Sequence, residues 1–301
     1  MSTPIKAALI FADGKLGVGL GHISRCTALK EELEAQGFKV NILDSALLES
    51  FKFQVPYSLI TIDSYVLPLE SYALVTKHAK KCLFFDDTLR LDYPQGIIVN
   101  NASCVDLKKY QIKYPNHTLF LGDGYSLTQN VFKSQKPSIL NQTIQRCLIT
   151  LGGEDILKLN SQLAQAILEA FPNLEIHCIT KDFKNLPKSI IAHSKLSAKE
   201  MAQCIRAMDI CICACGQSLR EILFCGIPVI ALEIASNQSA NLKSFQSCTL
   251  NLPKAYTFPK QQIVQKVIEF IKSYQDLSLR QTHQDAAQKL LRHKNLWKNA
   301  F

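Results

Sequence analysis

The sequence predicts an α/β protein built from two doubly wound domains of similar size. Apolar runs of strand length alternate with segments of helical period, and this alternation occurs twice along the chain. Such alternation is typical of a parallel sheet covered by helices on both faces. A polar stretch, 126–146, separates the two series, and 301 residues suffice for about two domains. We expect Rossmann-like domains at 1–138 and 139–301, with a ligand cleft between them.

The first domain is expected to begin with a strand, a glycine-rich loop and a helix. Residues 5–11 are almost entirely apolar, a helical pattern over 21–36 follows, and Gly37 is a natural helix stop. Further strands of this domain are expected at 39–43, 59–63, 82–85 and 96–100.

The second domain repeats the pattern and ends in two helices. Its strands are apolar and short, and its helices carry one apolar face. The strands are expected at 146–151, 174–180, 189–193, 209–214 and 228–232, and the helices at 161–170, 198–207, 218–225, 259–274 and 278–292.

Composition excludes several classes of protein. Apolar residues make up 47% and charged residues 20%, which is a globular balance, and no apolar run reaches the roughly 18 residues of a membrane span. We find no signal-peptide cleavage pattern and expect a cytoplasmic protein without membrane contact. The net charge of +9 favours anionic partners, but no basic run is interleaved with aromatics, so we expect no nucleic acid.

The eleven cysteines are expected to be reduced and buried. Cys211, Cys213 and Cys215 alternate in an apolar segment and should therefore lie on one face of a strand. Their spacing is not the C-x-x-C of a zinc site, so we expect small apolar side chains in a reducing compartment and no bound metal.

His22 is the most distinctive residue of the first domain. It follows the glycine-rich loop 14–21 at the first turn of the expected helix, where the helix dipole favours a neutral imidazole that can accept a proton. His22 could therefore be a general base that activates water, or only a polar residue that caps the helix. Arg25 lies on the same helical face and could balance phosphate charge or position a carboxylate near His22.

Carboxylates follow two strands of the first domain. Asp63 ends one strand and is followed by Tyr65, and Asp86 and Asp87 end another. The carboxyl ends of parallel strands face the ligand crevice, so these groups could orient His22, Arg25 or a sugar hydroxyl. Alternatively, they are helix N-caps. A metal site at Asp86 and Asp87 is disfavoured, because adjacent residues of an extended chain point in opposite directions.

The second domain carries two glycine-bearing turns after strands. Gly152 and Gly153 follow its first strand, and Gly216, Gln217 and Ser218 open a helix, where backbone N–H groups could bind a diphosphate. One turn further, Glu221 could accept hydrogen bonds from a ribose or simply favour the helix start. Past a later strand end, Asn237 and Gln238 could contact hydroxyls or phosphate, or belong to an ordinary polar loop.

Together these motifs resemble the UDP-2,4-diacetamido-2,4,6-trideoxy-β-L-altropyranose hydrolases of pseudaminic acid biosynthesis. The resemblance covers about residues 5–245 and rests on the order of the motifs, of which the G-x-G-H-x-x-R-C element is the most specific. The motifs are Asp13…Gly19-x-Gly21-His22-x-x-Arg25-Cys26, Ile62-Asp63-Ser64-Tyr65, Phe85-Asp86-Asp87, Leu151-Gly152-Gly153-x-Asp155, Gly216-Gln217-Ser218-x-x-Glu221, Gly226-Ile227-Pro228 and Asn237-Gln238.

The resemblance implies the GT-B architecture of nucleotide-sugar glycosyltransferases and a hydrolase that serves pseudaminic acid supply for flagellin glycosylation. It implies that His22 is the catalytic base, that uridine diphosphate binds the second domain, that the sugar C–O bond breaks with inversion, and that a monomer acts on a UDP-sugar without a cofactor. The residues expected to bind substrate are Asp13, Gly19, Gly21, Arg25, Asp63, Tyr65, Gly152, Gly153, Asp155, Gly216, Gln217, Ser218, Glu221, Asn237 and Gln238.

Two other functions remain open. A glycosyltransferase of the same fold would use the same UDP site and would need an acceptor surface on the first domain, for which Phe51, Phe53 and Tyr57 are the only indication. A catalytically silent nucleotide-sugar binding protein is the other alternative, in which Phe11 and Cys215, which depart from the family pattern, mark a decayed site.

Overall fold

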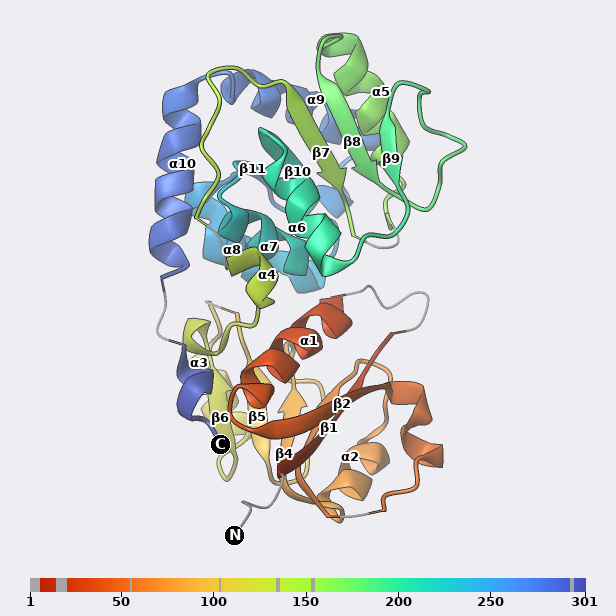
Figure 1. The fold of residues 1–301 in the computed structure, drawn as a ribbon, viewed down its shortest axis with the longest axis vertical. Helices are drawn as coiled ribbons and strands as arrows, with labels where there is room; N and C mark the ends of the chain where they lie inside the picture. The colour runs from red at the N-terminus through yellow and green to blue at the C-terminus, as the bar shows by residue number, and fades with distance from the viewer. Residues whose placement is uncertain are drawn as a thin grey trace. The chain divides into compact units, whose positions relative to one another are not determined.

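The computed structural model shows two compact units, Met1–Gln129 together with His293–Phe301, and Asn130–Arg292 (Figure 1). Each unit contains one six-stranded sheet whose neighbouring strands are all parallel. Among the helices that are described, none combines the length and the apolar character that crossing a membrane requires. The structure describes residues 6–14, 21–54, 56–102, 104–133, 136–152, 155–292 and 295–301.

The sheet of the first unit has the strand order β2-β1-β3-β4-β5-β6. After β1 the chain forms the edge strand β2, and it then forms β3 on the opposite side of β1. The strand order therefore reverses between β1 and β3. In open parallel sheets, the carboxyl ends of the strands at such a reversal form the ligand crevice. The elements are β1 Lys6–Ala12, α1 Gly21–Glu34, β2 Phe38–Asp44, η1 Ser45–Ser50, β3 Tyr57–Asp63, α2 Leu69–Thr76, β4 Ala79–Phe85, β5 Ile97–Asn100, α3 Leu107–Lys113, β6 Thr118–Leu121, η2 Asp123–Tyr125 and η6 Leu296–Asn299.

Helices cover both faces of this sheet. Alternate residues of β1 point to opposite faces, so Ile10 packs with Leu29 of α1, whereas Phe11 packs with Tyr72 of α2 on the other side. The strands are therefore apolar on both faces, as the near-continuous apolar run of β1 predicts.

The C-terminal segment completes the first unit. Trp297 of η6 is fully buried, and its ring meets that of Phe120 edge-on at 5.6 Å. Its indole Nε1 donates to the Tyr125 carbonyl at 2.9 Å, and Gln36 donates to the Trp297 carbonyl at 2.8 Å. The expected domain limits, 1–138 and 139–301, differ from the observed units here, because this aromatic contact returns the end of the chain to the first unit.

The sheet of the second unit has the order β12-β11-β10-β7-β8-β9, so its strand order reverses between β7 and β10. The elements are α4 Asn130–Lys133, β7 Arg146–Thr150, α5 Asn160–Ala170, β8 Glu175–Ile179, β9 Ile191–His193, α6 Ala198–Arg206, β10 Ile210–Ala214, α7 Gln217–Cys225, β11 Val229–Leu232, η3 Ser236–Gln238, α8 Ser239–Phe245, η4 Gln246–Cys248, β12 Leu250–Leu252, η5 Ala255–Thr257, α9 Lys260–Ser273 and α10 Leu277–Leu290.

Cys211 and Cys213 lie on one face of β10, and Cys215, the first residue after this strand, is on the same side, as predicted. Cys211, Cys213 and Cys215 are buried in the same apolar cluster, and their thiols are free. Ile210 and Ile212 face the opposite cluster. The cysteines thus behave as small apolar residues of a two-sided core.

The polar stretch 126–146 is held mainly by the second unit. The Asp209 carboxylate accepts from the backbone N–H of Gln145 and of Arg146, both at 2.8 Å. The guanidinium of the buried Arg280 donates to the carbonyls of Asn141 and Gln142. Although this stretch is polar, it is not a free linker. Its backbone N–H and C=O groups form hydrogen bonds with the buried side chains of Asp209 and Arg280.

Every helix and strand expected from the sequence is observed, with ends shifted by at most three residues. The helices and strands that were not expected have three to eight residues; they are α2, α3, α4, α8, β6 and β12. Segments of this length span at most about two helical turns, which is too few for a hydrophobic period to indicate them, so their structure depends on the neighbouring strands and helices.

Gly226 provides a test of packing in the second unit. It ends α7 in the left-handed region at φ 80°, and a Cβ built there would lie 2.6 Å from Cβ of Pro137. Gly152 has φ +85°, with nothing within 4 Å of such a Cβ. Both alanine variants should lose about 1–2 kcal/mol for the left-handed backbone, and Gly226→Ala should lose about 1–3 kcal/mol more for the clash.

Urea unfolding of both variants, followed by circular dichroism, measures this difference. Equal losses of unfolding free energy would show that the contact with Pro137 does not constrain Gly226.

Candidate functional site

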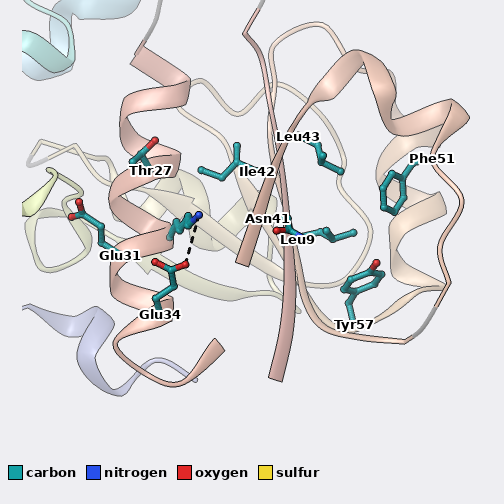
Figure 2. A pocket seen from close by; sticks show the side chains of 10 residues that line it. Leu9, Thr27, Glu31, Glu34, Asn41, Ile42, Leu43, Phe51 and Tyr57 are labelled. Carbon is teal, nitrogen blue, oxygen red and sulfur yellow. Dashed lines mark ion pairs between the residues drawn. The ribbon is translucent and has the colours of Figure 1, made fainter. Parts of the chain in front are cut away.

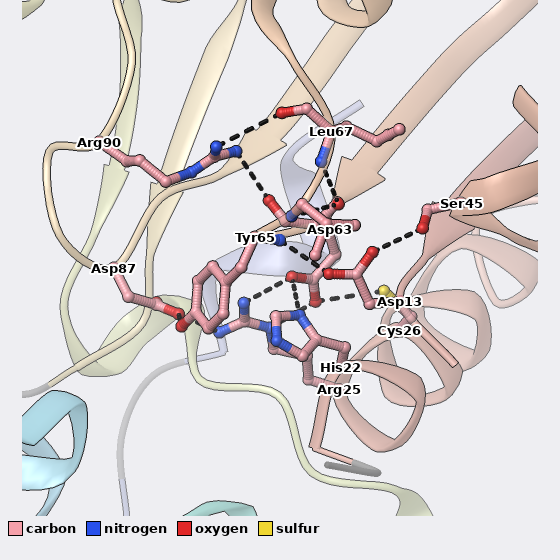
Figure 3. A network of polar contacts seen from close by, with 12 residues as sticks. Asp13, His22, Arg25, Cys26, Ser45, Asp63, Tyr65, Leu67, Asp87 and Arg90 are labelled. Atoms are coloured by element: carbon pink, nitrogen blue, oxygen red, sulfur yellow. Dashed lines mark hydrogen bonds and ion pairs between the residues drawn. The ribbon is translucent and has the colours of Figure 1, made fainter. Parts of the chain in front are cut away.

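A network of charged side chains lies where β1 and β3 end, at the strand reversal of the first unit (Figure 3). Asp13 follows β1 and Asp63 is the last residue of β3, and the backbone N–H of Asp13 donates to the Asp63 carbonyl at 3.1 Å. His22 and Arg25 come from the first turn of α1, which begins at Gly21. The structure therefore brings together these four residues that were expected to form a site, and Tyr65 is a fifth.

Asp63 is the centre of this network. Its carboxylate is almost fully buried; Oδ1 lies 2.5 Å from Nδ1 of His22, and both oxygens accept from Arg25, at 2.6 Å from Nη2 and 2.5 Å from Nε. Burial acts to raise the pKa of Asp63, but the ion pair with Arg25 and the contact with His22 outweigh it and hold the pKa well below its usual range. Asp63 is therefore an anion at neutral pH.

His22 is fixed in one orientation by this anion. A carboxylate can only accept, so Nδ1 of His22 carries the proton, and Nε2 is the nitrogen that can take another. The ring also meets that of Tyr65 edge-on at 4.6 Å, and the residue is 8% exposed. An imidazole oriented in this way by a buried carboxylate has the geometry of a general base.

Arg25 links the centre to a second carboxylate. Its Nη1 donates to Oδ2 of Asp87 at 2.8 Å, the same oxygen that accepts from the Tyr65 hydroxyl at 2.6 Å, and its guanidinium lies 4.6 Å from the ring centroid of Phe85. Burial and the negative charge of Asp87 raise the pKa of Tyr65, so its hydroxyl remains a donor. Of the two roles expected for Arg25, its direct contacts match the positioning of a carboxylate near His22.

Asp13 holds the backbone at the end of β3. Its oxygens accept from the Ser45 hydroxyl at 2.5 Å and from the Tyr65 backbone N–H at 2.7 Å. Sequence reasoning missed Ser45. No local signal in the sequence indicated this residue, because Ser45 reaches Asp13 only through the pairing of β2 with β1.

The three strand-end aspartates have different roles. Asp86 accepts from the backbone N–H groups of Thr88 and Arg90 and from the Tyr114 hydroxyl, so it stabilises the turn. Asp63 and Asp87 bind side chains instead of capping helices. As expected of adjacent residues of an extended chain, Asp86 and Asp87 have separate partners.

In the second unit, two of the expected turns lie side by side at the strand reversal. β7 and β10 pair with Thr150 opposite Cys213, and Gly152 and Gly216 follow shortly after these strands. Gly216 is the N-cap of α7, with φ −90° and ψ −153°, and a Cβ built there would meet nothing within 4 Å. Among the described residues, nothing fills the space that a side chain at Gly216, directly before α7, would take.

Two other expected residues of this unit, Asp155 and Gln238, are occupied by structural contacts. The oxygens of Asp155 accept from the backbone N–H of Leu159 and Asn160 at the start of α5. Oε1 of Gln238 accepts from the backbone N–H of Cys215 and Ile234, so it joins the ends of β10 and β11. Glu221 is buried in α7, at 6% exposure, and Asn237 is exposed in η3. Gly19 and Gly153 lie outside the described residues.

A separate hollow of about 510 Å³ lies along the edge of the first sheet (Figure 2). It is lined by Phe51, Tyr57 and residues of α1 and β2, including the Lys30–Glu34 ion pair. None of its lining residues belongs to the Asp63 network, because the hollow faces the middle of the strands and the network lies beyond their ends.

Replacement of Asp63 by Asn should cost about 3–5 kcal/mol at neutral pH, because Arg25 would remain buried without its main partner. The pKa of Asp63 is lowered in the folded protein, so its contribution is complete above about pH 4 and is lost as the pH falls through the lowered pKa. The difference in unfolding free energy between the wild type and Asp63→Asn should therefore shrink below about pH 4.

Urea unfolding between neutral and acidic pH tests this. Asp92→Asn is the control, since Asp92 pairs with Lys113 on the surface and its side chain is 88% exposed. Similar, small losses for both variants would contradict the central role of Asp63.

Comparison with curated proteins finds similar sequences. The chain is 29% identical over 253 residues to the pseudaminic acid cytidylyltransferase and UDP-2,4-diacetamido-2,4,6-trideoxy-β-L-altropyranose hydrolase of Helicobacter pylori, covering 81% of this chain and 47% of that protein. It is 24% identical to the uncharacterized protein MJ1062 of Methanocaldococcus jannaschii, covering 74% and 54%. The chain thus spans about half the length of these two relatives.

A third relative has nearly the same length. The spore coat polysaccharide biosynthesis protein SpsG of Bacillus subtilis is 22% identical over 306 residues, covering 88% of this chain and 89% of that protein. No family model matches the chain.

Solved structures show the same fold. MurG of Acinetobacter baumannii has a TM-score of 0.55 at 13% identity, covering 96% of this chain and 95% of that one. The calicheamicin glycosyltransferase CalG4 has a TM-score of 0.60 at 11% identity, covering 99% and 97%. A UDP-glucosyltransferase from Polygonum tinctorium has a TM-score of 0.62 at 10% identity, covering 97% and 94%. The expected fold of two Rossmann-like domains is confirmed. The expected resemblance of the sequence to the UDP-2,4-diacetamido-2,4,6-trideoxy-β-L-altropyranose hydrolase is confirmed as well.

Proposed function

We propose that the chain is a nucleotide-sugar hydrolase that converts UDP-2,4-diacetamido-2,4,6-trideoxy-β-L-altropyranose to UDP and the free sugar. The observation that carries this proposal is the His22–Asp63 pair at the strand reversal of the first unit. The similarity to the Helicobacter pylori protein supports the substrate, because hydrolysis of this UDP-sugar is one of the two activities in that protein's name.

In the proposed reaction, Nε2 of His22 takes a proton from water as the water oxygen attacks the anomeric carbon. The bond between this carbon and the diphosphate oxygen breaks, UDP leaves with the electron pair, and attack from the opposite face inverts the centre. The Asp63 carboxylate stabilises the imidazolium that forms, and Arg25 keeps this carboxylate ionised. A general base of this kind supplies about 10²–10⁴-fold in rate.

The second unit is proposed to bind UDP. The first N–H groups of α7, at Gly216 to Ser218, would face the diphosphate and stabilise the charge that develops on it as it leaves. Glu221 is one turn further along α7 and would accept hydrogen bonds from the ribose hydroxyls. Because the ribose is remote from the bond that breaks, this contact would add to binding of substrate and transition state alike.

A glycosyltransferase is the second candidate, and specific observations favour keeping it. Solved structures of similar fold are named as glycosyltransferases, and the hollow beside Phe51 and Tyr57 is a concave surface on the first unit. A transferase would release UDP only when an acceptor is present, whereas a hydrolase needs water alone. A silent binding protein would bind UDP-sugars and release no UDP.

The experiment is to incubate the protein with a panel of UDP-sugars, with and without lipid acceptors, and to follow UDP and free sugar by NMR. The wild type should release UDP without an acceptor, and His22→Ala should be slower by at least about 10²-fold, because the base acts only in the transition state. UDP affinity, measured by calorimetry, should stay within a few-fold.

His78→Ala is the matched control, since His78 stacks on Phe53 in the same unit and makes no contact in the Asp63 network. It should retain wild-type turnover. UDP release by His22→Ala at more than about a tenth of the wild-type rate would eliminate His22 as the base. Acceptor-dependent release would instead identify a transferase.

Gly216 allows a separate test of the UDP site. Its backbone is not in the left-handed region and a Cβ there would have no atom of the described residues within 4 Å, so Gly216→Ala should fold with an unchanged melting temperature. If the diphosphate occupies this space, the added methyl should weaken UDP binding by about ten-fold or more. Calorimetric titration gives the affinity, and an unchanged value would place the diphosphate elsewhere.

A further inference from the structure

Three side chains with metal-binding atoms converge at one edge of the sheet in the second unit. They are His177 on β8, His193 on the edge strand β9 and Cys204 on α6, and one ligand atom of each lies within 4.8 Å of the others. The register explains the convergence: His177 pairs with Ile191, so His193, two residues further along β9, points to the same face. Helix α6 supplies the thiol.

The two imidazoles present nitrogen atoms to each other. Nδ1 of His177 lies 3.0 Å from Nε2 of His193, and the rings stack with an angle of 13° between their planes. Without a metal, these nitrogens share one proton in a hydrogen bond. Two nitrogens bound to one tetrahedral Zn²⁺ at about 2.0–2.1 Å lie roughly 3.3 Å apart, so a shift of a few tenths of an ångström would admit the ion.

Glu175 fixes the orientation of His177. Its Oε1 lies 3.0 Å from Nε2 of His177, on the far side of the ring from His193. Since the carboxylate accepts this proton, the lone pair of a neutral His177 is on Nδ1 and is directed at His193. A histidine that donates one nitrogen's proton to a carboxylate and offers the other nitrogen is the usual arrangement around bound zinc.

The three ligands are accessible to a metal ion. The Cys204 thiol would lose its proton when a metal binds. All three residues are only partly buried, which leaves an ion a path from solvent.

We propose that His177, His193 and Cys204 bind one divalent metal ion of the zinc class, with Glu175 orienting His177. The two imidazoles and the thiolate favour Zn²⁺ over Mg²⁺ or Ca²⁺, and three protein ligands leave a fourth position for water. The ion would tie the three-residue strand β9 and helix α6 to β8. Sequence spacing did not indicate this site, because the ligands come from three elements and form no C-x-x-C motif.

The test is a Co²⁺ titration of the untagged full chain, read by absorption. Co²⁺ should give visible d–d bands of tetrahedral intensity and a thiolate-to-cobalt charge-transfer band in the near ultraviolet, and Zn²⁺ should abolish both. Cys204→Ser should remove the charge-transfer band, whereas Cys104→Ser, at an exposed cysteine of the first unit, should keep it. Glu175→Gln should weaken Co²⁺ binding by about 10–100-fold.

His193→Gln provides an independent test if Cys204→Ser does not fold, and His78→Gln is its control. Loss of the d–d bands in His193→Gln alone supports the site. Absence of the bands in the wild type, or a charge-transfer band that persists in folded Cys204→Ser, would overturn the proposal. Unchanged affinity in Glu175→Gln would overturn the role of Glu175.

Discussion

The polar end of the first sheet depends on one buried negative charge. Burying the Asp63 carboxylate carries a desolvation penalty of several kcal/mol, which only close and well-directed partners can offset. Arg25 provides a two-pronged contact, His22 a third and the Cys26 thiol a fourth at 3.5 Å. All three partners come from α1, so the same charge also fixes the start of this helix against β3. His22 is therefore positioned by electrostatics as much as by the fold.

The two units follow the same principle with different chemistry. Each has its strand reversal next to the first strand of its own sheet, and each places glycines or charged groups just beyond the strands that flank the reversal. In the first unit these groups are carboxylates held by Arg25, so the region is rigid and polar. In the second unit the corresponding turn at Gly216 leaves open space before a helix start. A catalytic group needs fixed polar partners, as His22 has in the first unit, whereas an anionic ligand needs open space at a helix start, as at Gly216 in the second unit. In the proposed hydrolase, the first unit therefore provides the catalytic base and the second unit binds the diphosphate.

The sequence allowed the fold class and the central site residues to be predicted because both depend on local patterns. Strand length, helical period and glycine stops located the main elements, a strand end located Asp63, and the glycine-rich loop before a helix located His22. The partners of these residues could not be predicted so readily. Ser45 meets Asp13 only because β2 lies beside β1, and Asp87 meets Arg25 only because β4 neighbours β3. The order of strands in a sheet is a tertiary property, and the hydrophobic periodicity of the sequence does not indicate it.

The His177–His193 pair was hidden for a related reason. Its geometry depends on the register between β8 and β9, and a slip of one residue would turn His193 to the opposite face. The short elements α2, α3, α4, α8, β6 and β12 were not predicted because their conformation depends on the strands and helices that they pack against.

The return of the C-terminal segment to the first unit also bears on how the protein is made. Trp297 is part of the core of this unit, yet the ribosome synthesises it only after the whole of the second unit. While residues 130–292 are being synthesised, Phe120 and Tyr125 of the first unit lack their contacts with the Trp297 ring. The order of folding is thus inverted with respect to the order of the chain: the second unit can finish first, and the nascent first unit exposes an aromatic surface that chaperones can recognise.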